Sequence, residues 1–197
     1  MVMTKEELII KTAEWARERG LHLGSHLMQA LKLAEEAGEL IGAHLKLKKG
    51  PSDKWRQVQK DSIGDMLVVM GVTRAIFVEN GVLGEFSVSN ADEGCLNVFD
   101  TFDAEREVFD RRLPKGVFIK YKSEVYLQKI VLRIGSIDAL YLDIKRAVVD
   151  LREIWVLLQY YCLAEGLDIY ECWELAYNEV AQRKGKTIGG VFVKNGD

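Results

Sequence analysis

Apolar residues recur every three to four positions along most of the chain, and glycine or proline interrupts this spacing at only a few places. Such a pattern is typical of amphipathic helices. Thr4, Ser25, Ser52 or Asp53, and Asp168 each precede a periodic segment and are suitable helix N-caps. We therefore expect helices over about 4–19, 26–47, 53–78, 123–165, with a pause at Gly135-Ser136, and 169–184.

The segment from about 81 to 122 has a different character. Short alternating stretches, GEFSVS and KGVFIKYK, flank an acidic patch, and Gly and Asn punctuate the segment. This pattern indicates some β structure or an irregular loop. We expect 1–197 to form a single domain, an all-α, four-helix-type bundle with a central loop/β insertion.

Composition and charge exclude several classes of protein. A net charge of −3 and a pI near 5.7 argue against a partner that is a nucleic-acid polymer. The three cysteines lack CxxC spacing, which argues against a zinc site or a disulfide framework. The N-terminus does not resemble a signal peptide, and Arg74 breaks the longest apolar stretch, so we expect a cytoplasmic protein with no membrane span.

Two groups of acids carry the candidate chemistry. Glu35, Glu36 and Glu39 share one face of the second helix, which taken alone is more typical of a solvated acidic surface. Asp65 differs, because valines follow it three, four and seven residues later and place it on a stripe that should be buried. A buried carboxylate requires a cation or stays protonated, and on a helical wheel the nearby Lys60 and Arg74 point away from it.

The short connection between the second and third helices predicts an antiparallel hairpin. Asp61 lies one turn before Asp65, and both lie about as far after the turn as the glutamates lie before it. Four or five carboxylate oxygens then converge, which favours a hard divalent cation, Mg²⁺ with Mn²⁺ as a second option, over purely structural acids.

These residues resemble motifs of the MazG-like nucleoside triphosphate pyrophosphohydrolases. EEAGE matches the family's EExxE element, and GD within DSIGDML looks like its ExxD element. The segment LREIWVLLQYYCLAEGLDIYECWELAYNEVAQRKG is similar to the family's last two helices. The resemblance covers about residues 5–79 and 147–197. It departs at Ser62, where the family has Glu, and the neighbouring Asp61 is positioned to replace that ligand.

The resemblance implies roles for individual residues. Glu36, Glu39 and Asp65 would be metal ligands together with Asp61, and the catalytic residues would be Glu36 and Glu35, the latter as a ligand or as the base for water. The substrate-binding residues that we expect are Lys32, Asn178, Arg183 and Lys186.

The function that this predicts is Mg²⁺-dependent hydrolysis of a (deoxy)nucleoside triphosphate to the monophosphate and pyrophosphate, for nucleotide-pool house-cleaning, in a homo-oligomer, dimer or tetramer. Two alternatives remain at this point. One is a nucleotide-binding or regulatory helical protein with weakened catalysis, which Ser62 and the insertion suggest. The other is hydrolysis of a phosphoribosyl nucleotide on the related fold.

Overall fold

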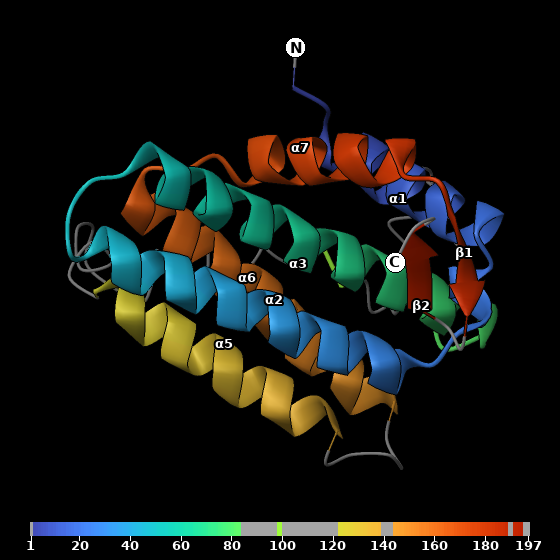
Figure 1. Ribbon diagram of the computed structural model, residues 1–197. Helices are drawn as coiled ribbons and strands as arrows, with labels where there is room; N and C mark the ends of the chain where they lie inside the picture. Colours follow the sequence, from blue (N-terminus) through green and yellow to red (C-terminus); the bar gives the residue numbers. More distant parts are fainter. Residues whose placement is uncertain (1, 84–97, 100–121, 139–143, 189–190, 195–197) are drawn as a thin grey trace. The chain divides into compact units, whose positions relative to one another are not determined.

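The computed structural model describes residues 2–83, 98–99, 122–138, 144–188 and 191–194. They form an all-α fold, as predicted, with one small β-hairpin. The insertion predicted at about 81–122 lies almost wholly outside the described residues. The elements are α1 (Lys5–Glu18), the 3₁₀ helix η1 (Leu21–Leu23), α2 (His26–Leu47), α3 (Asp53–Glu79), α5 (Ser123–Asp138), α6 (Ile144–Glu165), α7 (Ile169–Gln182), β1 (Gly185–Ile188) and β2 (Val191–Lys194) (Figure 1).

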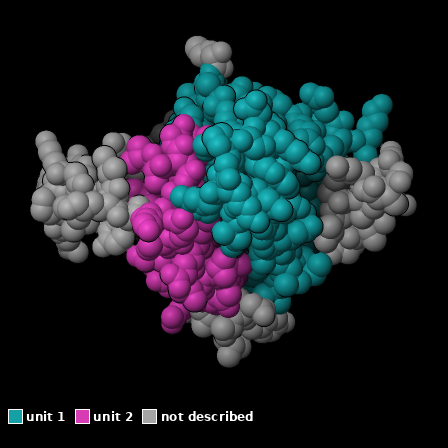
Figure 2. Space-filling view, turned by 60° about the vertical axis from the view of Figure 1, so that its left-hand side comes forward, with its two compact units in different colours: residues 1–82, 168–197 teal, residues 83–167 magenta. Residues whose placement is uncertain are grey.

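The chain divides into two compact units (Figure 2). Unit 1 comprises Met1–Val82 and Asp168–Asp197, and it contains α1, η1, α2, α3, α7 and the hairpin. Unit 2 comprises Leu83–Leu167 and contains α5 packed against α6. The expectation from the chain length that residues 1–197 form a single domain stays a prediction.

The predicted N-caps are confirmed at four helices. Thr4 and Glu7 form a capping box at α1, in which each side chain accepts the other residue's backbone N–H, at 3.2 and 2.8 Å. Ser25 caps α2, Ser52 caps α3, and Asp168 accepts two backbone N–H groups at the start of α7. Each cap satisfies donors that have no partner inside their own helix, so these helix starts are fixed locally.

Helix α3 is the central element of unit 1. It contacts α2, α7, α1 and η1, and in Figure 1 it lies between α7 and α2. From Ser62 to Phe77 every residue of α3 is buried except Asp65. A helix covered on nearly all sides needs small residues where its neighbours come closest.

Two glycines of α3 provide this close approach. A Cβ added at Gly64 would clash with the carbonyl oxygen of Cys172 and would lie 2.6 Å from the Cβ of Ala176, both on α7. A Cβ added at Gly71 would lie 2.6 Å from Cγ2 of Thr12 on α1. The missing side chains therefore allow α7 and α1 to pack directly on the α3 backbone.

The structure differs from the sequence-based expectations at two places, within α5 and after α7. The predicted pause at Gly135-Ser136 does not occur, since α5 continues to Asp138. A single glycine costs a helix only about 1 kcal/mol relative to alanine, and the Ser136 hydroxyl donates to the carbonyl of Arg133 at 2.7 Å, within the helix. Beyond α7, β1 and β2 pair antiparallel with Ile188 opposite Val191, a hairpin that the sequence reading did not predict.

Replacing Gly64 by alanine should destabilise the protein. The added methyl group would press on α7, and overpacking of this kind costs roughly 1–3 kcal/mol of unfolding free energy. The measurement is urea unfolding followed by circular dichroism. Gly42→Ala is the matched control, because Gly42 lies in α2 with nothing within 4 Å of its added Cβ, and it should gain roughly 0.5–1 kcal/mol. Equal stability of the two variants would contradict the close α3–α7 packing.

Candidate functional site

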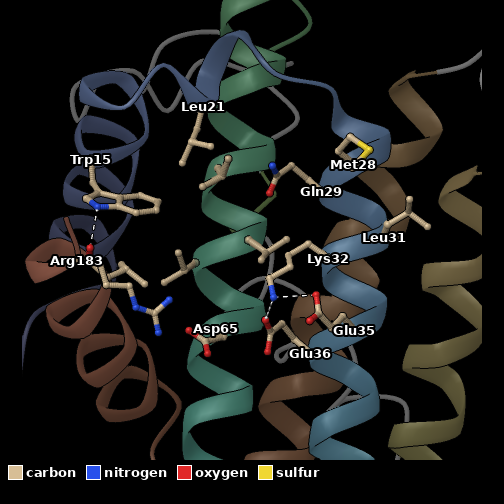
Figure 3. A pocket seen from close by; sticks show the side chains of 14 residues that line it. Trp15, Leu21, Met28, Gln29, Leu31, Lys32, Glu35, Glu36, Asp65 and Arg183 are labelled. Carbon is tan, nitrogen blue, oxygen red and sulfur yellow. Dashed lines mark hydrogen bonds and ion pairs between the residues drawn. The ribbon is translucent and has the colours of Figure 1, made fainter. Parts of the chain in front are cut away.

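Unit 1 encloses a cavity of about 310 Å³ between α1, α2, α3 and the end of α7 (Figure 3). One end is apolar, with Trp15, Leu21 and valines of α3 among the side chains that line it. The other end carries all the charged groups of the lining: Lys32, Glu35, Glu36, Asp65 and Arg183. A cavity of this size with an apolar part and a few convergent polar groups is typical of small-molecule sites.

Lys32 bridges two carboxylates of its own helix at the charged end. Its Nζ lies 2.8 Å from Oε2 of Glu35 and 2.7 Å from Oε1 of Glu36, the i,i+3 and i,i+4 neighbours. Partial burial of Lys32 and burial of Glu36 both oppose the charged form of the side chain. The hydrogen bonds to Glu35 and Glu36 outweigh that effect for Lys32 and raise its pKa, whereas burial prevails at Glu36 and raises the pKa of its carboxyl. The charged form of the Glu36 carboxyl would therefore be stabilised by a further cation.

Asp65 faces the same end of the cavity from α3. It makes no hydrogen bond or ion pair within the described part of the chain. Burial, and next the negative charge of Glu36, raise the pKa of Asp65 to about 7, although Arg183 and Lys32 both act to lower it. Near neutral pH this carboxyl is divided between its protonated and charged forms, so a bound cation would readily displace its proton.

Arg183 follows α7 and is fixed by contacts from α1. The Trp15 indole donates to the carbonyl of Val180 at 3.2 Å, while Arg19 lies over the Trp15 ring and donates to the carbonyl of Arg183 at 3.3 Å. The Arg183 guanidinium pairs with Glu179, and its Nε is buried without a hydrogen-bond partner among the described residues. That donor is available to an anionic ligand.

The structure brings together five of the predicted site residues: Lys32, Glu35, Glu36, Asp65 and Arg183. The expectation that the α2 glutamates and Asp65 lie at the same height agrees with the structure for Glu36, which faces the same end of the cavity as Asp65 (Figure 3). The cations that act on Asp65 come from α2 and α7. Lys60, which the wheel had placed away from it, pairs with Glu171 at 3.4 Å, and Arg74 is buried in α3.

Three other predicted residues, Glu39, Asp61 and Asn178, lie outside this cluster. Glu39 is exposed, and Asp61 accepts a hydrogen bond from Gln57 at 2.7 Å; neither lines the cavity. Both lie one helical turn beyond its charged end, next to Glu36 and Asp65 respectively. Asn178 is exposed outside the cavity, and the side chain of Lys186 lies outside the described part of the structure.

The donor set for a metal is smaller than the sequence predicted. No group of three or more His, Cys, Asp or Glu side chains within the described ranges is placed to hold a metal ion. Glu36 and Asp65 remain as two carboxylates that face the same end of the cavity, and Asp65 has no hydrogen-bond or ion-pair partner among the residues that the structure describes. Mg²⁺ in phosphate-binding sites commonly takes one or two carboxylates and fills its remaining positions with water and substrate phosphates. The residues present fit that minimal pattern.

Comparison with known proteins gives no assignment, since no family model, curated protein or solved structure matches this chain. The resemblance to the MazG-like enzymes thus depends on the motifs alone and stays a prediction. Among the described residues, no helix has both the length and the apolar character to cross a bilayer.

The pKa of Asp65 predicts a pH-dependent difference in stability. The folded protein holds the Asp65 proton up to about pH 7, whereas an ordinary aspartate loses it near 3.8. Folding therefore weakens as the pH rises from about 4 to 7, because the unfolded chain has released a proton that the folded chain keeps. Asp65→Asn avoids this effect, so the variant should be more stable than the parent at pH 8, and its advantage should shrink toward pH 4.

Thermal unfolding with a chelator present, from pH 4 to 8, measures this difference. Asp61→Asn is the control, because Asp61 lies one turn earlier on α3 and already has a hydrogen-bond partner. It should show no comparable gain at pH 8. A difference between Asp65→Asn and the parent that stays constant across the range would contradict the environment described for Asp65.

Proposed function

We propose that the protein binds a (deoxy)nucleoside triphosphate in this cavity and hydrolyses it to the monophosphate and pyrophosphate with Mg²⁺. The observation that carries the proposal is Asp65, a partly buried carboxyl without a partner among the described residues, facing Glu36 in a cavity that is also lined by the cationic side chains of Lys32 and Arg183. Opposite charges gathered at one end suit a phosphate chain with its metal ion, and the apolar end suits a base.

The cations supply the phosphate contacts in this proposal. Lys32 is held at the cavity by Glu35 and Glu36, and Arg183 offers its buried Nε. A planar guanidinium binds phosphate oxygens at two points, while a lysine acts as a point charge. As phosphates approach, Lys32 would exchange part of its contact with the glutamates for contact with the ligand, which frees carboxylate oxygens for a metal.

Glu36 and Asp65 would hold the metal ion, and Glu35 would accept a proton from water. A bound Mg²⁺ supplies neutralisation of the phosphate charge and activation of water. Glu36 and Asp65 come from different helices, so that the α2–α3 packing fixes their separation. Glu35 is exposed on the same face of α2, where solvent reaches it and can take up the proton afterwards.

Incubation with each dNTP and Mg²⁺ should release pyrophosphate, and Asp65→Asn or Glu36→Gln should reduce the rate at least about a hundredfold. A loss of this order follows when one preorganised electrostatic group is removed from an active site. Circular dichroism of each variant verifies that it is folded. The resemblance also implies Glu39 as a metal ligand, with Asp61 in place of the missing Glu, whereas of these four proposed ligands only Glu36 and Asp65 line the cavity. Glu39→Gln and Asp61→Asn therefore test which arrangement operates.

Glu79→Gln is the control for this assay, because Glu79 is exposed at the far end of α3 and lines no part of the cavity. It should keep the parent rate. Orthophosphate as the first product would exclude the proposed cleavage, and activity confined to a phosphoribosyl nucleotide in the same panel would transfer the assignment to that related reaction.

A second candidate function is nucleotide binding without turnover. Ser62 stands where the family has Glu, and its buried hydroxyl donates to the carbonyl of Val58 at 2.8 Å, inside its own helix. With Lys32 bound to Glu36 as well, the site has fewer carboxylate oxygens to offer a metal than the family pattern supplies. These contacts favour a scaffold that retained the cavity and lost the chemistry.

Calorimetry with Mg²⁺ and a non-hydrolysable nucleotide separates the two functions. Micromolar or tighter binding together with no pyrophosphate release would support the binding protein and refute the hydrolase. Binding with turnover supports the hydrolase. The cytoplasmic location and the homo-oligomeric state, dimer or tetramer, stay part of the proposal. Light scattering measures the oligomeric state.

A further inference from the structure

One uncharged polar side chain lines the apolar part of the cavity. Gln29 of α2 is 6% exposed and reaches the cavity beside Leu21 and Met28. Figure 3 shows it at the end of the cavity away from Asp65 and Glu36. The other nitrogen at this end, the Trp15 indole N–H, already donates to the carbonyl of Val180. Gln29 is therefore the amide that a ligand's apolar end would meet.

The chemistry of an amide suits recognition of a base. A glutamine side chain offers two N–H donors and an oxygen with two lone pairs, so it can hydrogen-bond within the protein and also contact a ligand. A phosphate group would gain little from this neutral amide, because the charged side chains of Lys32 and Arg183 at the other end of the cavity bind phosphate more strongly. The edge of a nucleobase presents a donor and an acceptor side by side, which a glutamine amide can match in a pairwise contact.

The spacing along α2 agrees with this division. Gln29 and Glu36 lie seven residues apart, which at 1.5 Å per residue is about 10 Å along the helix axis. Between them the cavity is lined from α3 by Val68 and Val69, which lie three and four residues beyond Asp65 and offer surface without hydrogen-bonding groups. A nucleotide has this same order, from the edge of its base through the sugar to its phosphates.

We propose that Gln29 binds the edge of the nucleobase and determines which base the site accepts, an inference that rests on the proposed function. Sites that hydrogen-bond a polar group of the substrate reject analogues that leave the buried amide without a partner. An apolar pocket alone discriminates bases weakly, because it senses only size and shape. The preference among bases should therefore depend on this one side chain.

The test measures binding of four α,β-non-hydrolysable deoxynucleoside triphosphates with Mg²⁺, and of tripolyphosphate as a ligand without a base. The parent protein should prefer at least one base. Gln29→Leu should lower the affinity for that nucleotide by at least about tenfold, which is the effect of losing one hydrogen bond to a buried amide. The four dissociation constants should then converge, while tripolyphosphate affinity stays unchanged.

Two further variants sharpen the result. Gln29→Glu keeps the size of the side chain but removes its N–H donors, so preference should shift toward bases that present an amino group. Gln128→Leu is the matched control, since Gln128 is exposed on α5 and lines no part of the cavity. It should bind all five ligands as the parent does.

Base preference that survives in both Gln29 variants would overturn the inference and leave the proposed function standing. If both Gln29 variants lost tripolyphosphate affinity as much as nucleotide affinity, the inference would also be overturned, because Gln29 would then support the fold of the cavity and not bind the base. A parent protein that binds neither nucleotides nor tripolyphosphate would instead refute the proposed function itself.

Discussion

The direct packing of α7 and α1 on the backbone of α3 is the constraint on which the rest of unit 1 depends. It requires Gly64 and Gly71, since a methyl group at either position would meet atoms of the neighbouring helix. With α2 packed against another side, α3 is covered over most of its circumference. This arrangement determines what surrounds Asp65, which follows Gly64 directly in the chain.

Burial of Asp65 explains the electrostatics of the cavity. A carboxylate in water has an ordinary pKa, but here surrounding helices remove solvent and Glu36 adds a like charge. Lys32 and Arg183 offset only part of that cost, because Lys32 is already bonded to Glu35 and Glu36, and Arg183 to Glu179. The site thus holds a proton that a metal ion could replace. Such a perturbed group in a cavity is a physical reason to expect function there.

The cavity also separates two kinds of chemistry along one helix. Residues of α2 contribute Gln29 near the apolar end and Lys32, Glu35 and Glu36 at the charged end. Arg183 reaches the charged end from just beyond α7, where Trp15 of α1 and Arg19, which follows α1, hold the backbone in place. An amphiphilic ligand with a polar edge, an apolar middle and an anionic end fits this order better than a simple anion would.

The sequence by itself determined the helices and the height at which Glu36 and Asp65 meet, because caps, periodicity and a short connection act locally. It grouped Glu39 and Asp61 with the site, and in the structure these two residues share helix faces with the site but lie one turn beyond the cavity. Only the tertiary structure decided that limit, together with the contacts of Trp15 and Arg19 that hold the backbone near Arg183 and the buried position of Gln29 in the cavity. Those contacts join α1, α2 and α7, which are far apart in the sequence. They form only when whole helices pack against one another, and no local sequence pattern encodes that packing.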